Sequence, residues 1–254
     1  MKDLQTEAEK KPFAAAVKAL WIEMFEDKES YVDHYMSSTW KHNRVLLLLR
    51  GEEIVSMLHL NPYTCIVQGE RLDLHYIVGV CTKKAEQGKG YMGQLVTEAL
   101  RICKEDGEPF TYLMPAAEAI YRPYDFVSAG WCDKFVIEAE EVEEVEEAAP
   151  SLPQARWDVI VPELGQAGSI QNVGNHTLQI CPFDRWTAGQ TKQLESFAAE
   201  LPMDMHAAWT AAYFAETDQQ MKCYDGELVA VWDQEKPIAI AAYLYDSHYG
   251  MYDS

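Results

Sequence analysis

Hydrophobic positions near the start of the chain recur first at helical spacing and then at strand spacing. Residues 14–25 place their apolar side chains on one side of a helix, and residues 30–40 predict a second, shorter helix. The segments 44–50 and 53–67 are separated by a Gly51-Glu52 turn signal and predict a β-hairpin. The chain is therefore expected to open with two helices and a hairpin.

Further elements of mixed type follow the hairpin. Residues 73–82 carry a continuous apolar middle, which is typical of a strand buried on both faces. Residues 91–107 have apolar positions at helical spacing and end in ordinary helix-stop residues. We expect a short buried strand at 109–115, one or two helical turns at 116–121, and a final strand or two at 128–139.

A run of acidic residues and two prolines then divide the chain. They predict a linker over residues 141–154, between a first domain at 1–140 and a second at 155–254. The alternative for the acidic run at 138–147 is that part of it extends a strand or forms a solvated helix.

The second part repeats the order of elements seen in the first. It predicts a strand at 177–183, helices at 188–201 and 206–217, and a hairpin at 227–245. A weak internal duplication would explain this similarity.

Composition narrows the class of protein. The 254 residues are 48% hydrophobic, which is enough for one large domain or two modest ones. No run of about 18 apolar residues exists, and the polar N-terminus lacks the apolar core of a secretion signal, so a cytoplasmic protein without a membrane span is expected. The net charge of −20 argues against nucleic-acid binding and is compatible with a cationic substrate, although acidic surfaces are common.

The six cysteines are scattered, without a C-x-x-C pair or a histidine at ligand spacing. We therefore expect free, buried thiols and no metal site. Cys81 lies beside the glycine loop and is a candidate nucleophile, but no activating base is visible near it in the sequence.

The glycines after residue 87 carry the most specific signal. Gly88, Gly90 and Gly93 form the pattern G-x-G-x-x-G, which also occurs in dinucleotide-binding turns. Such a fold places its first glycine directly after the strand and an acidic residue about twenty residues further on. Here TKKAEQ intervenes and no acid follows, so an NAD-binding oxidoreductase is the weaker interpretation. A Walker loop is also excluded, because Lys89 is followed by glycine.

An anion site fits the same residues better. The amides of residues 87–92 are expected at the N-terminus of a helix that opens near Gly90, where they and the helix dipole favour an anion. Lys83, Lys84 and Lys89 add positive charge in a very acidic chain.

Two segments resemble a known family. Residues 87–92, QGKGYM, resemble motif A of the GNAT N-acetyltransferase superfamily, written Q/R-x-x-G-x-G/A, with Met92 at the last position. Residues 113–126, LMPAAEAIYRPYDF, resemble the fifth strand of the family and its tyrosine-containing segment. Tyr121 falls on the tyrosine, and Asp125 replaces the usual glycine before Phe126.

The resemblance implies an α/β fold with a mixed sheet, in which two central parallel strands splay apart. The arrangement is similar to the enhanced-intracellular-survival type of bacterial acetyltransferase, which carries a second GNAT-like lobe. The second part of the chain would then be a smaller, partial GNAT-like α/β lobe.

The resemblance also implies an activity, in which an amine attacks the thioester of acetyl-CoA directly in a ternary complex. The acceptor would be a small-molecule or peptide amine, with a cationic one favoured by the acidic chain. The pantetheine would pair with the fourth strand and the pyrophosphate with the glycine loop. The implied cofactor-binding residues are Val78, Gly79, Val80, Gln87, Gly88, Lys89, Gly90, Tyr91 and Met92.

Tyr121 is the implied general acid, because a phenol can protonate the leaving thiolate, and Tyr124 is a weaker candidate for the same role. Asp73, His75 and Glu118 are alternatives for the base. Tyr121 and these three side chains each have an ordinary structural role as their alternative. A non-catalytic module that binds acyl-CoA is the alternative function, motivated by Met92 and Asp125. The sequence leaves the oligomeric state open, a homo-oligomer included.

Overall fold

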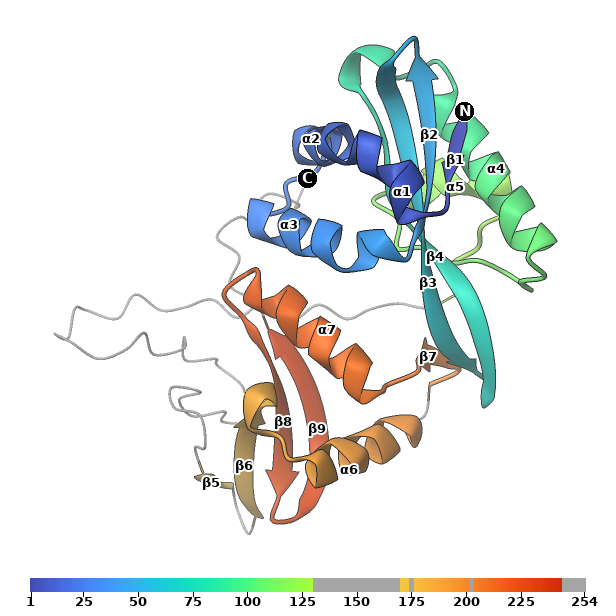
Figure 1. The fold of residues 1–254 in the computed structure, drawn as a ribbon. Helices are drawn as coiled ribbons and strands as arrows, with labels where there is room; N and C mark the ends of the chain where they lie inside the picture. The colour runs from blue at the N-terminus through green and yellow to red at the C-terminus, as the bar shows by residue number, and fades with distance from the viewer. Residues whose placement is uncertain (130–169, 174–175, 202, 244–254) are drawn as a thin grey trace, which may run out of the picture. The chain divides into compact units, whose positions relative to one another are not determined.

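The computed structural model describes residues 1–129, 170–173, 176–201 and 203–243 (Figure 1). The chain divides into two compact units. Unit 1 contains Met1–Ala129 and Met203–Ala208, and unit 2 contains Gly130–Pro202 and Trp209–Ser254. The predicted linker and the predicted strands beyond residue 129 lie outside the described residues.

The framework of unit 1 is a five-stranded antiparallel sheet in the order β1-β2-β3-β4, with β7 paired to β3. Its strands are β1 (Lys2–Leu4), β2 (Arg44–Arg50), β3 (Glu53–Val67), β4 (Glu70–Thr82) and β7 (Met205–Ala207). The predicted hairpin at 44–67 is confirmed as β2 and β3, which turn at Gly51.

Helices cover both faces of this sheet (Figure 1). One core contains Val45 and Leu47 together with residues of α2 (Ala14–Met24) and α3 (Glu29–Ser37). The other contains Leu46 and Leu48 together with residues of α4 (Tyr91–Glu105). This follows from the strand period of two, since successive side chains of β2 point to opposite faces. The predicted helices at 14–25, 30–40 and 91–107 are confirmed, apart from small shifts at their ends. Short helices α1 (Glu7–Lys10) and α5 (Glu118–Tyr121) complete the described helices of unit 1.

One prediction about the strands around residue 112 is wrong, and a second is not confirmed. The segment 109–115 forms no regular strand and makes only a parallel bridge between Tyr112 and Tyr76, where the Ile77 amide donates to the Tyr112 carbonyl at 2.9 Å. Prolines at 109 and 115 remove amide donors on both sides of this bridge, which keeps the pairing short. In the described sheets all regular pairings are antiparallel, so the expected splayed parallel strands are reduced to this single contact.

Strand β4 is also less buried than its apolar run predicts. Leu74, Ile77 and Cys81 are buried, whereas Tyr76 and Val80 stay partly exposed. Beyond the bridge at Tyr112, the described sheet places no regular strand on the outer edge of β4.

The described residues of unit 2 form a four-stranded antiparallel sheet in the order β5-β6-β8-β9 and two α-helices. Its elements are β5 (Ile170–Val173), β6 (His176–Pro182), α6 (Ala188–Ala199), α7 (Ala211–Lys222), β8 (Glu227–Asp233) and β9 (Lys236–Tyr243). Its core combines Leu194 of α6, Phe214 of α7 and Trp232 of β8. The strand near 177–183, the helix near 188–201 and the hairpin at 227–245 are confirmed.

The predicted helix at 206–217 begins too early. Residues 205–207 are strand β7, and α7 starts after Thr210, whose hydroxyl accepts from the Tyr213 amide at 3.2 Å. The cap and the pairing with β3 therefore override the alanine-rich helical pattern. Among the described helices, none combines the length and the apolar character needed to cross a bilayer.

Candidate functional site

A β-bulge interrupts β4 at the position expected to face a cofactor. His59 of β3 pairs with Val78 and Met57 pairs with Cys81, so β4 uses one more residue than β3 over this stretch. Gly79 has φ +61°, and a Cβ there would lie 2.9 Å from Cζ3 of Trp21. The position therefore requires glycine both for its conformation and for its contact with α2.

The bulge also changes which side chains share a face. Ile77 and Val80 are three residues apart, yet both pack in the core under α4, whereas Val78 and Cys81 pack in the core under α2 and α3. Val78, Gly79 and Val80 thus lie where the regular ladder is broken. Bulges leave backbone groups outside the ladder, so such groups can meet another molecule.

The glycine loop joins β4 to α4, as the sequence predicted. Gly90 is the N-cap of α4 with φ +75°, and it offers no side chain that could cap the helix. In the part of the chain that the structure describes, the backbone amides of residues 88–93 have no hydrogen-bond acceptor. The backbone amide of Gln87, which was also expected in this row, instead donates to the Lys84 carbonyl at 3.4 Å, and the side-chain amide of Gln87 donates to the Thr82 carbonyl at 3.2 Å.

A buried carboxylate underlies this loop. Glu86 is 4% exposed, its Oε2 lies 2.7 Å from the Lys89 ammonium, and its Oε1 contacts the Arg50 guanidinium. The hydrogen bond from Lys89 keeps the pKa of Glu86 below its usual range. Lys83 is likewise paired, 2.7 Å from Glu53. The expected local positive charge is therefore shared with two carboxylates.

Tyr121 lies at the end of α5, with its ring 5.8 Å from that of Phe126. Burial, and to a smaller extent the neighbouring Tyr76, raises its pKa, so the phenol keeps its proton at neutral pH. A protonated phenol is the form that a general acid needs.

Asp125 stands where the related motif has glycine. Its backbone is left-handed, with φ +63° and ψ +20°. Aspartate tolerates this region better than most side chains. The replacement therefore keeps the backbone shape that a glycine would provide, and the turn into Phe126 is preserved.

The two candidate bases on β4 are occupied by other contacts. Asp73 is exposed and accepts from the Thr64 hydroxyl at 2.6 Å. The His75 amide donates to Glu108 Oε2 at 2.8 Å, and the His75 ring contacts the same carboxylate. No contact of either residue with Tyr121 is found in the described segments. Glu118, the third candidate, accepts from Arg122 at 3.0 Å and from the Ser128 hydroxyl at 2.9 Å.

His75, Cys103 and Glu108 form one group that sequence analysis missed. Their ligand-type atoms lie within 4.8 Å of one another, although His75 comes about 30 positions before the other two residues in the sequence. These residue types can hold a metal ion, but here the histidine and the carboxylate bond each other directly. Cys81 is buried, and burial raises its pKa to about 12, which disfavours the thiolate that a nucleophile would need.

Tyrosine rings gather beside the parallel bridge, another feature that the sequence did not reveal. The Tyr76 ring lies 6.2 Å from that of Tyr63 and 5.1 Å from that of Tyr112, measured between centroids. The bridge at Tyr112, together with the Thr111 hydroxyl that donates to the His75 carbonyl at 2.6 Å, brings the third ring to β4.

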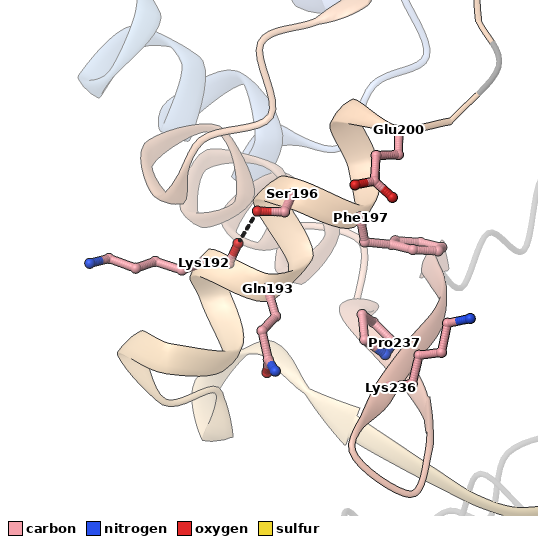
Figure 2. A pocket seen from close by; sticks show the side chains of 7 residues that line it. All are labelled: Lys192, Gln193, Ser196, Phe197, Glu200, Lys236 and Pro237. Carbon is pink, nitrogen blue, oxygen red and sulfur yellow. Dashed lines mark hydrogen bonds between the residues drawn. The ribbon is translucent and has the colours of Figure 1, made fainter.

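Two shallow grooves differ in chemistry. A groove of about 530 Å³ opens at the start of α4, and its lining includes Gly90, Gly93 and Tyr124. In unit 2, a groove of about 380 Å³ lies between α6 and the start of β9 (Figure 2). There Lys192 extends away from Lys236, so the two charges do not converge on one ligand position. The groove at α4 combines open space with the unpartnered backbone amides at the start of a helix.

Comparison with known proteins identifies the domain to which this site belongs. The family model of the acetyltransferase (GNAT) domain matches residues 8–129. No curated protein matches the chain in sequence.

Solved structures give the fold. A conserved protein of unknown function from Enterococcus faecalis V583, described as a probable N-acyltransferase, is similar with a TM-score of 0.55 and 14% identity. That likeness covers 97% of this chain and 55% of the other, so this chain spans about half of that protein's length. An aminoglycoside antibiotic 6'-N-acetyltransferase from Acinetobacter haemolyticus has a TM-score of 0.42 and 17% identity, over 56% of this chain and 100% of its own. A GNAT family acetyltransferase from Brucella melitensis, in complex with acetyl-CoA, has a TM-score of 0.40 and 14% identity, over 50% of this chain and 82% of its own.

Proposed function

We propose that this chain, whose residues 8–129 match the acetyltransferase (GNAT) domain, transfers the acetyl group of acetyl-CoA to a primary amine. The amine attacks the thioester directly while both substrates are bound. The observation that carries this proposal is the row of unpartnered amides at residues 88–93, directly after the bulged strand β4.

The pyrophosphate of acetyl-CoA is the anion that fits this row. Free amides at the start of a 15-residue helix, together with the helix dipole, favour a phosphate group there. Gly88 and Gly90 have φ of +76° and +75°, and a Cβ at either would meet nothing within 4 Å. The backbone is therefore open to a ligand as large as a diphosphate.

The bulge at Gly79 supports a position for the pantetheine arm and the thioester. The backbone groups of Val78 and Val80 would pair with the arm, and an amide at the bulge would polarise the thioester carbonyl. Holding the amine and the thioester in line can lower the activation barrier of such reactions by on the order of 7–11 kcal/mol. Tyr121 would then protonate the departing thiolate of CoA, and its raised pKa keeps the phenol protonated at neutral pH until that step.

The acceptor is proposed to be a cationic amine in a small molecule or a peptide. The net charge of −20 favours the approach of cations. Such an amine must lose a proton before it attacks. Asp73 is the more accessible candidate base, since His75 is bound to Glu108 through both its amide and its ring.

Unit 2 is proposed to be a partial GNAT-like lobe of the enhanced-intracellular-survival type. Its order β6, α6, α7, β8, β9 repeats the order β1, α2, α3, β2, β3 of unit 1. The pairings also correspond, because β6 pairs with β8 and β8 with β9, as β1 pairs with β2 and β2 with β3. The segment 203–208 is counted with unit 1 and supplies β7 to its sheet.

Calorimetric titration with acetyl-CoA, run beside the Gly90→Glu variant, tests the proposed site. Micromolar binding by the wild type that the variant loses is expected, because a carboxylate at residue 90 repels the pyrophosphate. A panel of amines assayed for release of free CoA then tests the reaction. Binding of acetyl-CoA without turnover on any amine would contradict the proposed enzymatic activity. It would favour the alternative function, a regulatory module that binds acyl-CoA.

A further inference from the structure

Two tyrosines three residues apart in the sequence occupy different places in unit 1. Tyr121 packs against Phe126 beside Tyr76. Tyr124, in contrast, reaches the first turn of α4, where its hydroxyl occupies the space that a side chain at Gly93 would need. The next atoms of the ring, Cζ and Cε1, lie 3.4 and 3.8 Å from that Cβ position.

This contact explains the third glycine of the G-x-G-x-x-G pattern. Gly93 is helical and has no positive φ, so its backbone does not demand glycine. The residue must be small because the Tyr124 hydroxyl lies over it. The glycine pattern is therefore coupled to a residue outside the loop.

The Tyr124 hydroxyl and the free amides of the loop face the same groove. Gly90, Gly93, Gln94, Thr97 and Tyr124 all line this space of about 530 Å³. Within the described chain, neither the hydroxyl nor the amides of residues 90–93 have a hydrogen-bond partner. A carboxylate from Glu98 also borders the groove, but its two oxygens accept from Arg101 at 2.7 and 2.9 Å.

We propose that Tyr124 is a cofactor-binding residue, whose hydroxyl donates a hydrogen bond to the pyrophosphate of acetyl-CoA beside the α4 amides. This inference rests on the proposed position of the pyrophosphate. A phenol adds a donor without adding charge, and hydrogen bonds to charged groups are the stronger ones. Tyr124 then contacts the pyrophosphate of the cofactor, whereas Tyr121 acts at its thioester.

The test is the affinity of Tyr124→Phe for three ligands, measured by calorimetry: acetyl-CoA, CoA and 3'-dephospho-CoA. Because all three contain the pyrophosphate, each should bind about tenfold more weakly to the variant than to the wild type. Tyr121→Phe is the matched control, with the same chemical change three residues away. Its dissociation constants should stay within about twofold of the wild type, since Tyr121 acts on the leaving thiolate.

The outcomes separate this inference from the proposed function. Unchanged affinity of Tyr124→Phe for all three ligands would overturn the inference. A loss confined to acetyl-CoA would place the hydroxyl at the thioester, and a loss absent with 3'-dephospho-CoA would place it at the 3'-phosphate; either result would also overturn it. If the wild type bound none of the three ligands, the proposed cofactor site itself would be wrong.

Discussion

The indole of Trp21 lies directly against the Cα of Gly79, so helix α2 packs on the bulge of β4. A Cβ at residue 79 would lie 2.9 Å from Cζ3, 3.4 Å from Cη2 and 3.5 Å from Cε3 of this ring. The bulge and the N-terminal helices are thus fitted to each other. A change at either residue should disturb the strand that is proposed to hold the cofactor.

Gly79→Ala should lower the free energy of unfolding by about 3 kcal/mol. About 1 kcal/mol comes from the left-handed backbone, and the remainder from displacing the buried indole. Gly69→Ala is the control, because Gly69 also has a positive φ of +83° but a Cβ there meets nothing within 4 Å. Urea unfolding of both variants measures the difference, and equal losses would show that the contact with Trp21 is unimportant.

Gly93→Ala and Tyr124→Phe should be strongly coupled. Alone, Gly93→Ala forces the Tyr124 ring away and should destabilise unit 1. When the hydroxyl is removed, the nearest atom is Cζ at 3.4 Å, and alanine is tolerated in the helix. A double-mutant cycle of unfolding free energies should give a coupling of about 1–2 kcal/mol. Additive effects would mean that Tyr124 does not lie over Gly93 in solution.

Tyr121→Phe should reduce kcat by about 100-fold or more while leaving the dissociation constant of acetyl-CoA nearly unchanged. The raised pKa of Tyr121 means that the wild-type phenol stays protonated to a higher pH than a free tyrosine. Ionisation of Tyr121 should therefore lower the kcat of the wild type only above about pH 10. The kcat of the variant should not show this decrease at high pH. A pH profile of kcat for both proteins, with amine ionisation measured separately, checks this expectation.

His59 should make unit 1 sensitive to acid. It is fully buried among the rings of Trp21, Tyr35 and Trp40, and burial lowers its pKa to about 3. The unfolded chain takes up this proton near pH 6.5 and the folded chain does not, so stability is lost as the pH falls from about 6.5 towards 3. The slope is expected to reach about 1.4 kcal/mol per pH unit.

The measurement is the free energy of unfolding against pH for the wild type and His59→Gln. Loss of the imidazole lowers the free energy of unfolding at all pH values. It should also make that free energy depend less steeply on pH below about 6.5, because the proton taken up by His59 on unfolding is no longer involved. An identical slope in the two proteins would contradict the buried neutral histidine.

Periodicity was sufficient to predict most helices and strands. The apolar stripe of residues 14–25 and the hairpin at 44–67 are local patterns, and they appear as α2, β2 and β3. The glycine loop was also predictable, because Gly88 and Gly90 mark backbone that only a flexible residue adopts easily. These signals act within a few residues of the chain.

Features that depend on distant partners could not be predicted in this way. The extra residue of the bulge is defined by the register of β4 against β3, which no local pattern of Val78–Val80 encodes. The helix predicted at 206–217 was placed too early, because residues 205–207 pair with β3 and the helix begins only at Ala211. The position of Tyr124 over Gly93 depends on a turn about 30 residues later in the chain. The left-handed conformation of Asp125 could not be predicted from its residue type alone.

Strand β7 has a consequence for synthesis of the protein. It pairs with residues of β3 that lie about 140 positions earlier in the chain, from Cys65 to Val67. A ribosome adds roughly 5–20 residues per second, so β3 waits on the order of 10 s before its partner has been made. During that interval the nascent chain carries an uncovered sheet edge at these residues, the kind of edge to which other chains can add. The acetyltransferase domain is therefore translated long before the last strand of its sheet, β7, has been made.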